Sequence, residues 1–172
     1  MYSTAELELK YYDITELYDL AEELLSTAES PYITDPEAQI NLVQPLIEQV
    51  SESTDILTEA FTEVANQPKN VSKRYQTKVE GALRRIYIAM DEYHKTIAGT
   101  AKEHTRALRN IADPVVEKIR RQVETIIAVF VDFVDLSLDR IMQKSHIEEL
   151  KARQEKIASM LFHANQMQRG GV

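Results

Sequence analysis

Apolar residues recur every three or four positions along most of this chain, and this spacing limits its fold more than any other feature. Between residues 4 and 30 the apolar seam is Leu7, Tyr11, Ile14, Tyr18, Ala21, Leu25 and Ala28. Between residues 34 and 66 it is Ile40, Val43, Ile47, Val50, Thr54, Leu57, Phe61 and Val64. Steps of three and four residues place side chains on one face of an α-helix. The sequence therefore predicts long amphipathic helices that pack side by side at shallow crossing angles.

Prolines indicate where these helices begin and end. Pro31 ends the first helix, because proline lacks an N–H donor and restricts the residue before it. Asp35-Pro36 and Asp113-Pro114 each place an N-cap residue before a proline, which is typical of a helix start. Together with the seams, these signals predict helices over residues 4–30, 34–66, 72–112 and 114–142.

The segment 114–142 is the most apolar stretch of the chain. If it is helical throughout, its apolar residues fill an arc of roughly 240°, which predicts a central helix that touches at least two neighbours. Ser145 and Glu148 have the spacing of a capping box, so we expect a break near 143–145. Residues 146–168 are more polar. They are predicted to form a fifth helical segment that either packs on the bundle or projects from it.

The fold class that follows is all-α, an elongated up-down bundle of four long amphipathic helices with a fifth C-terminal helical segment. We predict a single domain over residues 1–168 and a frayed tail over 169–172. Nine residues are Gly or Pro, too few for a turn-rich β protein. The predicted third helix would reach about 60 Å and the first cannot cover it, so either the bundle tapers to fewer helices at one end or a second chain completes it.

Charge is distributed unevenly along the sequence. Residues 1–68 hold one basic residue against fifteen acids, a net charge of −14, whereas residues 69–112 hold ten basic residues and four acids, a net charge of +6. The favoured interpretation is that the basic residues face the acidic first half inside the bundle. The alternative is a dipolar molecule that associates head to tail or docks a charged partner. The overall charge of −8 and the lack of a known motif argue against nucleic-acid binding.

Neither disulfides nor membrane spans are predicted. The chain contains no cysteine. Its first residues lack the basic and apolar regions of a signal peptide. The longest uncharged apolar run, residues 126–131, is far shorter than the roughly 20 residues that span a bilayer. We therefore expect a cytoplasmic protein with no integral membrane association.

No catalytic, cofactor-binding or metal-binding residue is predicted. Two-metal sites in helical bundles use Glu-x-x-His pairs on facing helices, and none of the four histidines, His94, His104, His146 and His163, follows a glutamate at this spacing. Asp91-x-x-His94 is the nearest pattern and occurs once. His104 lies on the seam of the third predicted helix, which favours a hydrogen-bonded histidine at the edge of the core. Phosphate loops, dinucleotide-binding glycines and nucleophile elbows are absent from the sequence.

Three acids, Asp132, Asp135 and Asp139, form a polar strip on the predicted fourth helix. The first interpretation is a solvated strip that only orients this helix. The second pairs the acids with basic residues such as Arg84 or Arg85. A cation site ranks third, because calcium and magnesium sites usually take their ligands from loops.

Two non-enzymatic functions agree with these features. The continuous seams favour a structural or protein–protein interaction protein that associates with itself or with another helical protein. The alternative is an amphipathic protein that coats a lipid or polymer-granule surface. A metal-binding bundle enzyme ranks third.

Overall fold

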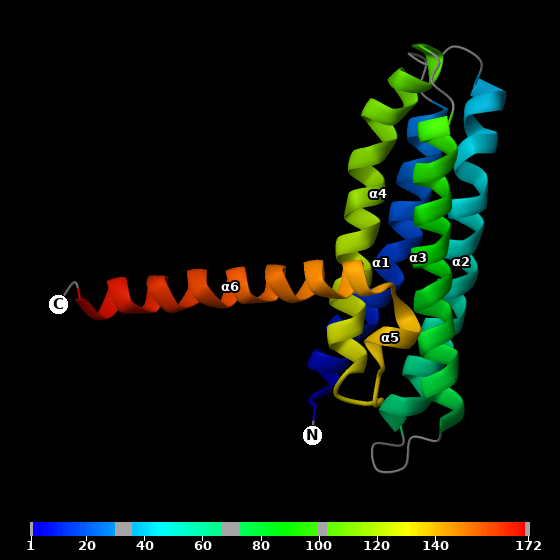
Figure 1. Ribbon diagram of the computed structural model, residues 1–172. Helices are drawn as coiled ribbons and strands as arrows, with labels where there is room; N and C mark the ends of the chain where they lie inside the picture. Colours follow the sequence, from blue (N-terminus) through cyan, green and yellow to red (C-terminus); the bar gives the residue numbers. More distant parts are fainter. Residues whose placement is uncertain (1, 30–35, 67–72, 100–102, 171–172) are drawn as a thin grey trace.

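The computed structural model describes residues 2–29, 36–66, 73–99 and 103–170. Six helices follow one another within these ranges: α1 (Thr4–Ala28), α2 (Pro36–Asn66), α3 (Lys73–Gly99), α4 (Glu103–Phe130), α5 (Leu138–Ile141) and α6 (Lys144–Gly170). Helices α1 to α4 lie side by side as a bundle, whereas α6 leaves it sideways (Figure 1). The predicted all-α up-down bundle of four long helices with a further C-terminal helix is confirmed.

Helix α1 begins where the sequence indicates, but its buried face differs slightly from the predicted seam. The Ser3 hydroxyl accepts a hydrogen bond from the backbone N–H of Glu6 at 3.2 Å, as an N-cap residue does. The buried residues of α1 are Ile14, Leu17, Leu20, Ala21, Leu24 and Ala28. Tyr18, from the predicted seam, lies at the edge of the core, because its hydroxyl needs a polar partner and donates to Asp55 on α2.

Helix α2 follows its predicted seam closely. Its buried apolar residues include Val43, Val50, Leu57, Phe61 and Val64. Thr54 is also buried, and its hydroxyl donates to the carbonyl oxygen of Val50 at 2.6 Å. This bond satisfies a polar group inside the core.

The predicted boundary between the third and fourth helices is wrong. Helix α3 ends at Gly99 and α4 begins at Glu103, so Asp113-Pro114 lies inside α4 rather than at its start. The Asp113 carboxylate does not cap a helix. It accepts hydrogen bonds from the Tyr93 hydroxyl at 2.9 Å and from Arg109 Nε at 3.4 Å. Gly99 indicates the observed end of α3, since glycine commonly ends helices, and this signal competes with the helix start suggested by Asp113-Pro114.

This correction makes the four bundle helices similar in length. They contain 25, 31, 27 and 28 residues, which correspond to about 40 Å each. The prediction that one long helix extends beyond its neighbours and leaves an end uncovered is therefore wrong. The surface that is left uncovered lies elsewhere in the molecule.

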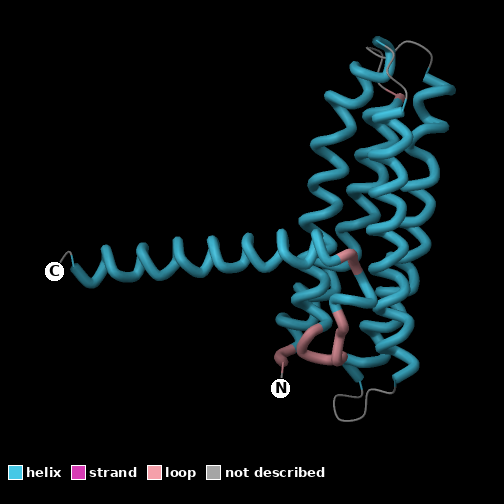
Figure 2. Tube along the Cα trace, viewed as in Figure 1, coloured by secondary structure: helices cyan, strands magenta, loops and turns pink. Residues whose placement is uncertain are grey.

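Helix α4 also ends earlier than predicted, at Phe130, and residues 131–137 form a connection rather than helix. Figure 2 shows this connection at the end of the bundle near the N-terminus. The wide apolar arc was predicted for one continuous helix over residues 114–142, and it does not exist because α4 ends at Phe130. Val131, the next residue, is 59% exposed. Phe133 from the connection packs edge-on against Phe61 of α2, with ring centroids 5.6 Å apart. Phe130 at the end of α4 also packs edge-on against Phe61, with ring centroids 6.1 Å apart.

The bundle is closed on three sides and partly open on the fourth. The closest helix pairs are α2 with α3, α1 with α2 and α1 with α4, whereas α3 and α4 touch much less. None of the helices in the described ranges is both long and apolar enough to cross a membrane. The division into a 1–168 domain and a 169–172 tail stays a prediction, since α6 continues to Gly170 and the last two residues lie outside the described ranges.

Candidate interaction surface: the elbow and the arm of α6

Helix α6 is buried at its start and exposed along the rest of its length. Ile147 and Leu150 belong to the core, whereas every side chain from Gln154 to Met167 is exposed. We call residues 154–167 the arm. We call α5 together with the first part of α6, residues 138–153, the elbow. The prediction left open whether this segment packs or projects, and the structure shows that it does both in turn.

The arm carries an apolar face that nothing in the described chain covers. Ile157, Leu161 and Ala164 continue the seam at steps of four and three residues, and Met160 and Met167 flank it on one side. The exposed fractions are 55% for Ile157, 62% for Leu161 and 79% for Met167. Contiguous exposed apolar surface of this kind marks an interaction site more often than scattered single residues do.

The elbow fills the partly open side of the bundle between α3 and α4. Ile141, Met142, Ile147 and Leu150 are all buried there. Arg140 fixes α5 to α3, because its Nε donates to Glu80 Oε2 at 2.7 Å. The side chain of Glu80 is almost fully buried, so this charge-assisted bond satisfies a carboxylate that would otherwise be costly to bury.

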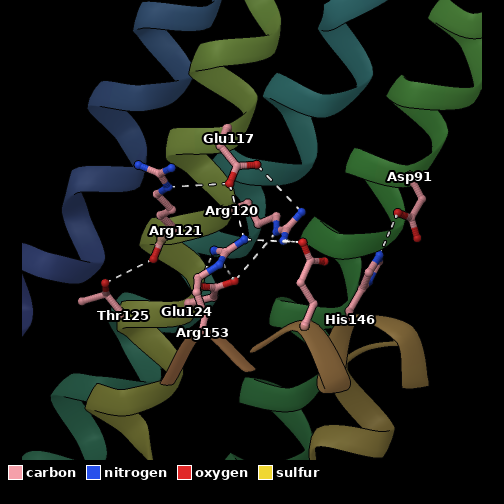
Figure 3. Close-up of polar contacts among 9 residues, drawn as sticks. Asp91, Glu117, Arg120, Arg121, Glu124, Thr125, His146 and Arg153 are labelled. Atoms are coloured by element: carbon pink, nitrogen blue, oxygen red, sulfur yellow. Dashed lines mark hydrogen bonds and ion pairs between the residues drawn. The ribbon is translucent and has the colours of Figure 1, made fainter. Parts of the chain in front are cut away.

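Five charged residues tie α6 to α4, and we call them the ionic cluster: Glu117, Arg120, Glu124, Glu149 and Arg153. Arg153 Nη1 lies 3.1 and 3.0 Å from the two carboxylate oxygens of Glu124. Arg120 Nη2 lies 2.6 Å from Glu149 Oε1, and this hydrogen bond lowers the pKa of Glu149. Figure 3 shows Glu117, Arg120, Glu124 and Arg153 converging on one side of α4.

A second set of contacts ties the elbow to α3. The His146 ring stacks on Tyr87, with centroids 5.7 Å apart, and its Nε2 lies 3.6 Å from Asp91 Oδ1 (Figure 3). Burial raises the pKa of the Tyr87 phenol far above its ordinary value. The elbow is therefore held from two helices at once, which fixes the direction in which the arm leaves the bundle.

The three acids of the predicted strip do not share one helix face. Asp132 and Asp135 lie in the connection after α4, and Asp139 lies in α5. Asp132 accepts a hydrogen bond from the Tyr2 hydroxyl and lies 3.8 Å from Lys10 Nζ, so it pairs with the N-terminal segment and not with α3. The strip was predicted on the assumption that the fourth helix continues to residue 142. Helix α4 ends at Phe130, before the first acid of the strip.

Asp135 and Asp139 line an open groove of about 780 Å³ beside α3. The groove also contains Lys73, Arg84, Arg140 and Glu80, so its three basic and three acidic side chains balance. Arg84 donates to the Arg140 carbonyl oxygen at 3.4 Å rather than to either aspartate. A groove with balanced charge gives no chemical preference for a cation or an anion.

The histidines do not converge. His94 is exposed beside Tyr93, and His163 is exposed on the arm. The side chain of His104 lies outside the described residues. Within the described ranges, no group of three or more His, Cys, Asp or Glu side chains could hold a metal ion. Asp91, which forms the predicted Asp-x-x-His pattern with His94, faces His146 instead.

The basic residues of α3 form no ion pair with the acidic helices α1 and α2 in the described part of the chain. Lys73, Arg74, Arg84 and Arg85 are exposed, and no ion pair joins them to the described parts of α1 or α2. Helix α1 pairs with α4 instead, through Lys118 Nζ and Glu23 Oε1 at 2.8 Å. The favoured interpretation of the charge pattern, in which basic residues face the acidic first half, stays a prediction.

The ionic cluster was not predicted from the sequence. The signal that could have suggested it is the i,i+4 spacing of Glu149 with Arg153 and of Arg120 with Glu124, which places paired charges on single helix faces. Such spacing also occurs on ordinary solvated helices, so it does not reveal that the two faces meet.

Three comparisons with known proteins give no further guide. No family model, no curated protein and no solved structure matches the chain.

Proposed function

We propose that this protein is a non-enzymatic interaction protein that associates with itself through the arm of α6. The observation that carries the proposal is the apolar seam of the arm, which is exposed beyond the packed first part of α6. We call this first part, residues 144–153, the root. Burying this seam against a partner would remove contiguous apolar surface from water, the main driving force of protein association.

The stability of the arm also favours a partner. The arm contains about four helical turns whose side chains are all exposed, and an isolated helix of this length is only marginally stable in water. A second helix packed along the seam would supply the contacts that usually stabilise an amphipathic helix.

The root of α6 supports the same function. The ionic cluster and the buried residues of the elbow hold the first turns of α6 on two helices of the bundle. A fixed root presents the arm in one direction, which lowers the entropy lost when a partner binds.

The coating of a lipid or polymer surface is supported less well. Interfacial helices usually carry Lys or Arg beside their apolar face, and residues 157–167 contain no Lys or Arg. Co-flotation of the purified protein with lipid vesicles would favour this alternative.

The test of self-association is the molar mass in solution, measured by light scattering over a hundredfold dilution. We expect a mass above that of one chain at high concentration, falling toward 19.7 kDa on dilution. Leu161→Asp on the seam should give a monomer at every concentration. The matched control is Ser159→Asp, which adds the same charge on the opposite face of the arm and should behave as the unmodified protein. A single chain at the highest concentration would contradict the proposal.

A further inference from the structure

The seam of the arm begins inside the molecule. Leu150 is 5% exposed in the elbow, and the seam continues through Ile157 and Leu161, which are more than half exposed. The steps are seven and four residues, so the three side chains lie on one face of α6. The exposed seam is thus the continuation of an apolar contact that the chain already makes.

A notch lies at the inner corner where the arm leaves the bundle. It has a volume of about 450 Å³, and Leu150 and Ile157 of α6 form its apolar part. Its polar rim is lined by Arg121, Glu124, Thr125, Arg153 and Gln154. An apolar side chain that arrived along the seam would meet Leu150 and Ile157 in this notch. The seam and the notch together form one continuous docking surface.

The charge of the arm selects the kind of partner. From Ile157 to Met167, about three helical turns, the chain contains no Asp, Glu, Lys or Arg. Two such segments can pack together without like-charge repulsion, whereas the chain as a whole carries a net charge of −8. A neutral apolar seam is complementary to another neutral apolar seam, and the chain itself supplies one.

The shape of the molecule determines the direction of pairing. The bundle extends on both sides of the root of α6 (Figure 1). Paired helices lie about 8–10 Å apart, and a four-helix bundle is roughly 20 Å wide. Parallel arms would therefore force two bundles into the same space. Antiparallel arms place the bundles at opposite ends.

We propose that two copies of this chain pair their arms antiparallel, so that the Met167 end of each arm reaches the notch of the other copy. This inference rests on the proposed self-association and adds the surface and the geometry. About five apolar side chains on each arm, at about 100 Å² each, bury on the order of 1,000 Å² in total. This area is at the lower end of specific interfaces, so the dimer should dissociate on dilution.

The test uses spin labels on single cysteines, which is straightforward because the chain contains no cysteine. Ala158→Cys lies near the centre of the arm, and Lys151→Cys lies in the elbow. With the arms overlapping over residues 154–167, the two labels at position 158 should lie about 12 Å apart. The two labels at position 151 should be about 30 Å apart, from a rise of 1.5 Å per residue. Light scattering of each labelled variant confirms that it retains the mass of the unlabelled protein.

Each outcome has a distinct meaning. A short distance at position 158 with a long distance at position 151 supports the antiparallel pair. Short distances at both positions indicate parallel arms and overturn the inference. A dimer with long distances at both positions places the contact on another surface, so the inference fails while self-association stands. A monomer at all concentrations removes the proposed function itself. In the supported case, Leu161→Asp should raise the dissociation constant by roughly a hundredfold or more, and Ser159→Asp should leave it unchanged.

Discussion

Two leucines of α6 test whether the elbow and the arm differ as the structure shows. Leu150 and Leu161 are the same residue type in one helix, with exposed fractions of 5% and 62%. Leu150→Ala removes a packed side chain and leaves a cavity, so it should lower the free energy of unfolding by about 3 kcal/mol. Leu161→Ala removes only the burial free energy of the part of the side chain that the monomer already covers. Full burial of a leucine contributes about 1.5–3 kcal/mol, so the cost in the monomer should stay below about 1 kcal/mol.

The measurement is urea-induced unfolding followed by far-UV circular dichroism, at a dilution where the unmodified protein is monomeric. In light scattering at high concentration the larger effect should come from Leu161→Ala, which should weaken self-association more than Leu150→Ala does. The reason is that Leu161 contributes to association and Leu150 to folding. Equal losses of unfolding free energy would show that the elbow is not packed more tightly than the arm. A loss under about 1 kcal/mol for Leu150→Ala would refute the described burial of the root.

Three further predictions concern the bundle and its contact with α6. Phe61→Ala should lower the free energy of unfolding by about 3–5 kcal/mol, measured in urea, because Phe61 packs among aromatic rings in the core. Burial raises the pKa values of Tyr87 and Tyr93 above those in the unfolded chain, so stability should be complete below pH 10 and fall above it, by about 1.4 kcal/mol per pH unit for each tyrosine. Replacing both tyrosines with phenylalanine should flatten this dependence, and an unchanged slope would exclude them as its cause. Arg153→Ala should speed amide hydrogen exchange around the root of α6 about fivefold, corresponding to about 1 kcal/mol, whereas Arg121→Ala, at a more exposed cation, should have little effect.

The seams predicted the number of long helices and their packing, because the three- and four-residue spacing reflects the burial of one helix face. The boundaries near Pro114 were wrong for a local reason. An Asp-Pro pair has the same sequence whether aspartate caps a helix or bonds to a side chain on a neighbouring helix, as Asp113 bonds to Tyr93. The end at Phe130 was missed because apolar residues recur beyond it, with Val131, Phe133 and Val134 interrupted only by Asp132, and periodicity alone does not distinguish a helix from a partly buried connection.

The candidate surface was predicted only in part. The polar composition of residues 146–168 suggested that this segment could leave the bundle, and the arm does so. The contacts that fix its direction, such as Arg153 with Glu124 and His146 with Asp91, join residues that are far apart in the sequence. One sequence alone does not show which charged helix faces meet, since spacing within a helix carries no information on its neighbours.

The attachment of α6 to both α3 and α4 gives the arm the properties of a lever. The root from Lys144 to Arg153 is about 14 Å long, and Met167 lies about 35 Å from Lys144, at 1.5 Å per residue. If α6 pivots at Lys144, a shift of about 1 Å at Arg153 moves the tip by about 2.5 Å. A small change in the separation of α3 and α4 would therefore cause a larger displacement at the far end of the arm. A partner bound there would be displaced with it.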